Sequence, residues 1–254
     1  MKDNNYICTN RTKEYKNRVE NIINNSKKEI LDFFEFSDDS RFNFNVYIYD
    51  TNEELVKGLQ TRGFKKDPDY MCACTKGEDH SLNFYEPLDK SDVDWIKDEY
   101  DKVIYHELIH GIQHYIYGKQ PEWLTEGIAK YLDGMYKEEM IYSHLEDTYS
   151  NELEYVLKEK IDVDNPLSMN ELVNEFNESI SYYHSYLIVS YLIEIEGKSE
   201  FIKKIYDNNY IKELENRDLI NESINYYICK FNIKVKWWYD KYIFKSFKYR
   251  WNTL

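Results

Sequence analysis

Cysteine, proline and glycine are scarce in this chain of 254 residues. Its four cysteines follow no spacing typical of a disulfide framework. Cys72 and Cys74 share one face of a predicted strand, where they cannot easily bridge each other, so we expect reduced thiols. No repeat and no linker rich in glycine and serine interrupts the chain. The sequence therefore predicts a single domain of residues 1–254.

Long apolar runs and dense basic surfaces are missing as well. The first thirty residues lack an apolar stretch of signal-peptide length, and no later stretch approaches a membrane span. We therefore expect a cytoplasmic protein that does not contact a membrane. The formal net charge is −14, which leaves no dense basic face for phosphate groups. Nucleic acid is accordingly not an expected partner.

The apolar pattern predicts an α+β fold that is predominantly helical. Residues 1–118 are expected to form an α/β subdomain with a small mixed sheet, and residues 119–254 an all-helical subdomain. The predicted elements are a helix over 13–36, a strand over 41–50, a short helix over 51–63, two strands within 70–87, a long helix over 93–118, and helices after Pro121, within 140–160, after Ser168, over 179–197 and at the C-terminus around Trp237 and Trp238.

The stretch "VIYHELIHGIQHYIYG" carries the strongest chemical signal in the chain. On a helix, His106 and His110 lie one turn apart on one face, about 6 Å apart along the axis, so both imidazoles can reach one ion. Glu107 follows His106 at once, which completes the pattern His-Glu-x-x-His of zinc hydrolases. The pattern predicts two Zn²⁺ ligands and a general base. The alternative is a surface helix that binds no metal.

His114 continues the same stripe but is not an expected ligand. It lies about 12 Å along the helix axis from His106, too far for a metal held between His106 and His110. A metzincin site is also excluded, because it needs glycine and histidine where this chain has Gln113 and Ile116. We expect His114 on the helix surface or on the wall of a cleft.

A catalytic zinc site needs a third protein ligand and one open position. Glu126 lies 16 residues after His110, on a helix that begins near Pro121 and can fold back beside the first helix. The small residues Gly127 and Ala129 would allow the two helices to approach closely. Taken alone, however, a glutamate on a helix is usually a solvated surface charge.

The segment "HELIHGIQHYIYGKQPEWLTEGIAKYL" closely resembles the gluzincin metallopeptidases, whose core is thermolysin-like, and most of all their bacterial branch. The resemblance is good from about residue 100 to 200. It implies a zincin-like fold, with His106, His110 and Glu126 as zinc ligands and Glu107 as the general base. It also implies that the substrate is a peptide or a protein.

A second segment, "YYHSYLIVSYLIEIEG", is similar to a gluzincin helix that packs across the active site. In the family this region contributes a tyrosine or histidine that stabilises the oxyanion. Tyr182 fits that role best, and Tyr183 and His184 remain possible. Plain core packing is the alternative for each. The strand "SLNFYEP" likewise resembles the family's edge strand, which pairs with an extended substrate.

The chain departs from the thermolysin pattern at one position. That pattern places aspartate four residues after the glutamate ligand, where it orients a zinc-bound histidine. Here the position is Lys130. The orienting group must come from elsewhere, with Asp133 or a backbone carbonyl as the candidates.

These features predict zinc-dependent hydrolysis of peptide bonds. Zn²⁺ would polarise the scissile carbonyl and acidify a water, and Glu107 would carry a proton from that water to the leaving amine. Two alternatives stay open, a narrow-specificity intracellular processing protease and a catalytically silent zincin-fold protein that binds metal in a regulatory role. The intact Glu107 weighs against the silent protein. Cleavage preference and oligomeric state are not legible in the sequence.

Overall fold

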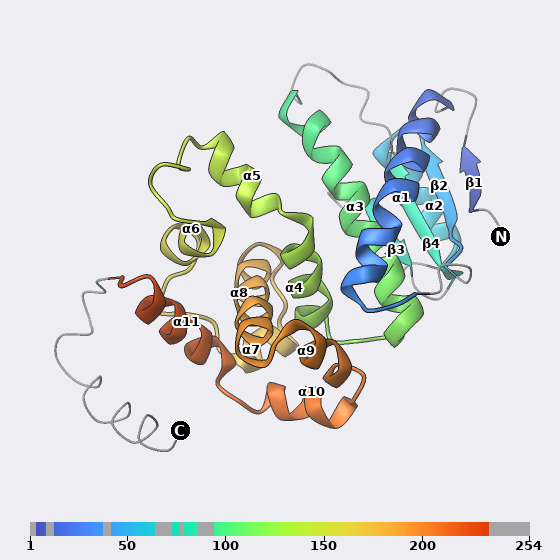
Figure 1. Ribbon diagram of the computed structural model, residues 1–254. Coiled ribbons are helices and arrows are strands. Elements are labelled where there is room, and N and C mark those ends of the chain that lie inside the picture. Colours follow the sequence, from blue (N-terminus) through green and yellow to red (C-terminus); the bar gives the residue numbers. More distant parts are fainter. Residues whose placement is uncertain are drawn as a thin grey trace.

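The computed structural model describes residues 4–8, 13–37, 42–63, 73–76, 79–85 and 94–233. One four-stranded sheet lies at one side of the molecule, and helices make up the rest (Figure 1). The strands are β1 (Asn5–Cys8), β2 (Asn45–Tyr49), β3 (Ala73–Lys76) and β4 (Ser81–Tyr85), in the spatial order β1-β2-β4-β3. The pairs β1–β2 and β2–β4 are parallel, and β3–β4 is antiparallel. The predicted α+β, mostly helical class is confirmed.

Alternation along the strands gives the sheet one strongly apolar face. Val46 and Ile48 on β2 pair with Leu82 and Phe84 on β4, and all four side chains are buried in the main core. That face packs against α1 (Lys13–Phe33) and α3 (Asp94–Tyr117). The opposite face is covered by α2 (Asn52–Thr61), whose Leu55 is buried in a small second cluster. The sheet therefore supports α3 on one side and is closed by α2 on the other.

One expectation about the strands is wrong, and one strand was not foreseen. The segment Ser81–Tyr85 is not an edge strand, because β4 is paired with β2 on one side and β3 on the other. Among the described strands β3 and β1 form the edges. The strand β1 was not expected, because its four residues have little apolar pattern of their own and gain their partner only from β2, forty residues later.

Every described element after α3 is a helix. The predicted helices after Pro121, after Ser168 and over 179–197 are present, and the Ser168–Glu171 capping box forms both of its hydrogen bonds. The region 140–160 is not one helix, because residues 143–151 separate two short ones. These helices are α4 (Glu122–Asp133), α5 (Met135–Tyr142), α6 (Glu152–Glu159), α7 (Met169–Asn174), α8 (Glu178–Glu196), α9 (Lys198–Lys204), α10 (Asn208–Glu215) and α11 (Leu219–Lys230).

The helix α4 is held between α3 and α8. A Cβ atom on Gly127 would lie only 2.5 Å from the carbonyl oxygen of Ser185 on α8, so this glycine allows α8 to approach closely. We expected the small residue to serve the approach to α3, and the structure corrects that expectation. On α3 itself, Ile104, Leu108 and Ile109 are buried on the side turned to the core. Core packing on both sides therefore sets the position of α4 beside α3.

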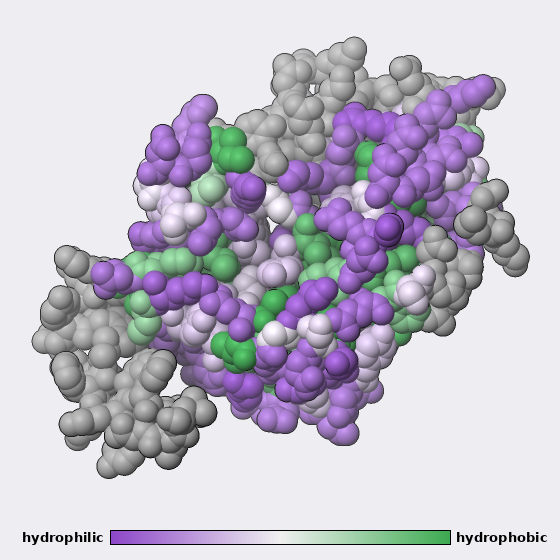
Figure 2. All heavy atoms as spheres, in the orientation of Figure 1, coloured by the Kyte–Doolittle hydropathy of each residue, from purple (hydrophilic) through white to green (hydrophobic). Residues whose placement is uncertain are grey.

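The described surface offers no continuous apolar face in the view of Figure 2, where hydrophilic residues predominate and apolar ones form small separate patches. None of the described helices is long and apolar enough to cross a membrane. The predicted C-terminal helix with Trp237 and Trp238 lies outside the described residues. The division into subdomains at residue 118 stays a prediction, although all described strands do precede that residue.

Candidate metal centre

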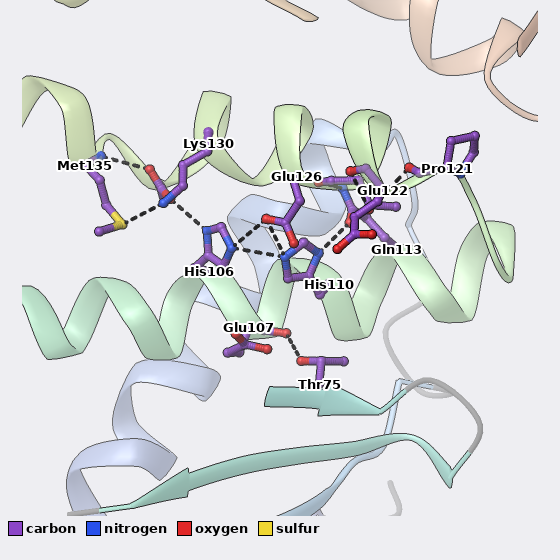
Figure 3. A network of polar contacts seen from close by, with 12 residues as sticks. Thr75, His106, Glu107, His110, Gln113, Pro121, Glu122, Glu126, Lys130 and Met135 are labelled. Atoms are coloured by element: carbon purple, nitrogen blue, oxygen red, sulfur yellow. Dashed lines mark hydrogen bonds and ion pairs between the residues drawn. The ribbon is translucent and has the colours of Figure 1, made fainter. Parts of the chain in front are cut away.

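Two histidines of α3 and one glutamate of α4 point toward one another (Figure 3). The Nε2 atom of His106 lies 3.0 Å from the Nε2 atom of His110. The Oε2 atom of Glu126 lies 3.2 Å from the first nitrogen and 3.3 Å from the second. The predicted ligand residues are thus brought together, although His110 and Glu126 are 16 residues apart. We call His106, His110 and Glu126 the candidate centre.

The candidate centre is largely shielded from solvent but not sealed. The side chains of both histidines are 12% exposed and that of Glu126 is 15% exposed. Within the described part of the chain, these three residues are the one group whose donor atoms lie close enough together to hold a metal ion. Two imidazole nitrogens and a carboxylate oxygen suit a transition-metal ion better than Ca²⁺ or Mg²⁺, which prefer oxygen ligands.

A buried carboxylate orients His106. The Nδ1 atom of His106 lies 2.8 Å from Oδ2 of Asp133, whose side chain is fully buried. The other oxygen of Asp133 accepts a hydrogen bond of 2.8 Å from the backbone N–H of Met135. An ionised carboxylate can only accept, so Nδ1 of His106 carries the proton and Nε2 turns its lone pair toward the candidate centre. Of the two orienting groups that the sequence left open, the structure places Asp133 in contact.

A neutral amide orients His110. The Nδ1 atom of His110 lies 3.1 Å from Oε1 of Gln113, a side chain that is only 2% exposed. The amide nitrogen of Gln113 donates to the carbonyl oxygen of Thr125 at 3.1 Å. Because that carbonyl can only accept, the amide oxygen must face His110, whose Nδ1–H is then the donor. The sequence did not reveal this role, although Gln113 stands one helical turn after His110.

Charges inside the candidate centre shift the pKa values of its members. Burial alone would lower the pKa of His110, but Glu126, together with Glu107 and Gln113, outweighs burial and raises this pKa to about 9. Burial would raise the pKa of Glu126, whereas His110 and His106 hold it well below its usual range. Burial opposes ionisation of Asp133 too, and Lys130 and His106 lower its pKa nonetheless. Because the pKa of His110 is raised, a metal cation must compete with a proton for this imidazole.

Glu107 lies on a different side of α3 from the two histidines. Figure 3 shows His106 and His110 turned to α4, while Glu107 lies on the side of α3 that faces β3. The backbone carbonyl of Glu107 accepts a 2.8 Å hydrogen bond from the hydroxyl of Thr75 on β3. The predicted general base therefore lies on the side of α3 that faces the edge strand β3.

The three candidate oxyanion donors on α8 have different surroundings. The ammonium group of Lys130 lies 5.3 Å from the ring centroid of Tyr182. Tyr183 packs against Tyr136 with ring centroids 5.1 Å apart. His184 is buried, and its Nδ1 atom lies 3.0 Å from the carbonyl oxygen of Ile180. Tyr182 thus lies beside the lysine that also reaches Asp133, whereas His184 is tied to its own helix.

His114 is not a member of the candidate centre. Its side chain is half-buried on α3, one turn beyond His110. Burial lowers its pKa, and His110 and His80 add to that effect. Its place on the helix surface or on the wall of a cleft stays a prediction.

An α+β fold with two histidines and a carboxylate converging on one point defines a candidate metalloprotein. A family described as "Peptidase of plants and bacteria" matches residues 9–151, more than half of the chain. The chain belongs to this family of peptidases. The matched segment includes α3 and α4, and hence the whole candidate centre, whereas α8 lies beyond it. Family membership implies that peptides or proteins are the substrates. No curated protein matches the chain.

Proposed function

We propose that this peptidase is a zinc-dependent metallopeptidase of the gluzincin type. In this proposal His106, His110 and Glu126 hold Zn²⁺, Glu107 is the general base, and Tyr182 donates a hydrogen bond to the oxyanion. The observation that carries the proposal is the convergence of two Nε2 atoms and one Oε2 atom at mutual distances of 3.0 to 3.3 Å.

These distances support zinc as the metal. Four ligands arranged tetrahedrally around Zn²⁺, at about 2.0 to 2.2 Å from it, lie about 3.3 to 3.6 Å from one another. The separations between the three donor atoms, 3.0 to 3.3 Å, lie at or just below the lower end of this range. Two histidines and one glutamate are also a ligand set typical of catalytic zinc, which keeps a fourth position open for water or substrate. Asp133 and Gln113 support the fit, because both leave the Nε2 lone pairs free to bind.

The residues of this chain would move the protons. When bound, zinc supplies a Lewis acid that polarises the scissile carbonyl and makes water more acidic. The carboxylate of Glu107 accepts a proton from the attacking water and passes it to the leaving amine nitrogen. The hydroxyl of Tyr182 donates to the carbonyl oxygen as negative charge develops on it. β3 is an edge strand of the sheet and contacts the backbone of Glu107. An extended substrate would pair with its outer edge.

The variant Glu107→Gln tests the proposal. It keeps the size of the side chain but cannot accept the proton, so we expect zinc to bind as in the wild type while peptide cleavage falls by about a thousandfold or more. Zinc is measured by elemental analysis, and cleavage with a peptide library before and after treatment with a chelator. Retained cleavage in Glu107→Gln would refute the assigned base. Zinc binding by a wild type that cleaves nothing would favour the regulatory metal-binding alternative.

A further inference from the structure

Lys130 is a largely shielded cation close to the candidate centre. It lies on α4 four residues after Glu126, and its side chain is 11% exposed. Its Nζ atom lies 3.5 Å from Oδ2 of Asp133 and 3.3 Å from the sulfur of Met135. The rings of Tyr136 and Tyr182 lie within 6 Å of the same atom, with centroids at 5.9 and 5.3 Å. Among these neighbours only Asp133 is negatively charged, and the thioether and the two aromatic rings are uncharged. Asp133 is therefore the residue that pairs with the charge of Lys130.

Lys130 and His106 share one carboxylate oxygen. Oδ2 of Asp133 is the atom that contacts both Nδ1 of His106, at 2.8 Å, and Nζ of Lys130, at 3.5 Å. Asp133 therefore orients His106 while its negative charge is already balanced by the ammonium group. Glu126 and Asp133 each bring a negative charge to the centre, and Lys130 offsets that of Asp133. Such an offset acts strongly on a divalent cation, because the side chains are mostly shielded from water.

We propose that Lys130 is a positioning residue that sets the metal affinity of the candidate centre by balancing the charge of Asp133. The inference rests on the proposed function, because it concerns the same metal. The ammonium group of Lys130 lies beside the carboxylate that orients His106, and its positive charge weakens the attraction of the site for a divalent cation. Asp133 thus orients His106, but because Lys130 offsets its charge, it raises the metal affinity less than an unpaired carboxylate would.

The sign of the effect separates this role from a packing role. If Lys130 served only to fill space against Tyr136 and Tyr182, any substitution would loosen α4 and weaken metal binding. If its charge is what matters, a neutral side chain of similar length must tighten metal binding. Arginine, which keeps the charge, must leave the affinity near that of the wild type. A gain of affinity is not an outcome that a structural defect produces.

The dissociation constant for Zn²⁺, measured at neutral pH by competition with a chromophoric chelator, tests the inference. We expect Lys130→Met to bind zinc roughly tenfold more tightly than the wild type and Lys130→Arg to stay within about threefold of it. Lys130→Gln, which keeps a hydrogen-bond donor but no charge, should follow Lys130→Met. Lys158→Met is the matched control, since it removes a lysine paired with Glu154 on α6 and should not change the constant.

The outcomes keep this inference apart from the proposed function. A wild type that binds no zinc contradicts the proposed function itself. A wild type that binds zinc, together with Met and Gln variants that bind it equally or more weakly, overturns only the role of Lys130. Far-ultraviolet circular dichroism identifies a variant that does not fold. The remaining neutral variant then decides the question against Lys130→Arg.

Discussion

His106 and His110 lie one turn apart on α3, yet the two ends of the candidate centre are built differently. At the His106 end, where α4 passes into α5, a buried carboxylate contacts Nδ1 and is itself paired with Lys130. At the His110 end, near the start of α4, a neutral amide contacts Nδ1 and holds a backbone carbonyl of α4. One end is therefore built from charges and the other from neutral hydrogen bonds.

The difference indicates a division of roles. Asp133 determines both the tautomer of His106 and the charge near the metal, because it is ionised and fully buried. Gln113 determines the tautomer of His110 and also links α3 to α4 next to Glu126, but it adds no charge. We therefore expect the His106 end to control metal affinity and the His110 end to control chiefly the alignment of the two helices.

The largest effect on zinc binding is expected from Glu126→Ala, because this change removes contacts to both histidines. Glu126 is the one residue of the centre that contacts both histidines, at 3.2 and 3.3 Å. Its removal takes away a proposed ligand and the negative charge facing both imidazoles. We expect zinc affinity and cleavage to fall by about a thousandfold or more, more than for any residue behind the ligands. Zinc titration and a peptide cleavage assay measure the two losses.

Glu213→Ala is the control for this prediction, since it removes an exposed glutamate from α10. It should bind zinc and cleave peptides like the wild type. Stoichiometric zinc in Glu126→Ala with unchanged affinity would mean that the glutamate is not a ligand.

Asp133→Asn should have the second largest effect. In the wild type, one carboxylate oxygen accepts from Met135 while the other faces His106 and Lys130. An asparagine has a single oxygen, so it cannot serve both sides. If the oxygen stays with Met135, the amide N–H₂ faces His106 and favours the wrong tautomer. We expect zinc affinity to fall by roughly ten- to a hundredfold, as measured by chelator competition.

The same substitution at Asp101 offers a comparison. Asp101 on α3 pairs with Arg18 on α1 and is about half exposed. Asp101→Asn should leave zinc affinity unchanged, because an exposed ion pair contributes little to stability. An Asp133→Asn protein with wild-type affinity would show that the charge at the His106 end has no role.

The members of the candidate centre could not all be predicted equally well from the sequence. His106, His110 and Glu107 follow from spacing on one helix, where geometry is local. Glu126 required the resemblance to a family, because only tertiary packing brings α4 beside α3. Asp133 was one of two open candidates. Gln113 was missed, since its role depends on a carbonyl of α4 that no local pattern reveals.

The fold, too, was predictable only where it depends on local sequence. The amphipathic helix α1 and the strongly apolar helix α8 were predicted close to their observed bounds. The order of the strands was not, because pairing joins residues far apart in the chain, as in Asn5 with Asn45 and Val46 with Leu82. A strand's place at the edge or inside the sheet depends on those partners and not on its own residues.

The smallest effect on metal binding is expected from Gln113→Met, which removes the neutral contacts at the His110 end. His110 would lose its acceptor at Nδ1, and α4 would lose its tie to α3 at Thr125. Since no charge changes, we expect zinc affinity to fall by only a few-fold, less than for Asp133→Asn. The lost buried hydrogen bonds should lower the free energy of unfolding by about 1 to 2 kcal/mol, measured by urea denaturation of the metal-free protein. A loss of zinc affinity as large as that of Asp133→Asn would mean that orientation, and not charge, governs both ends.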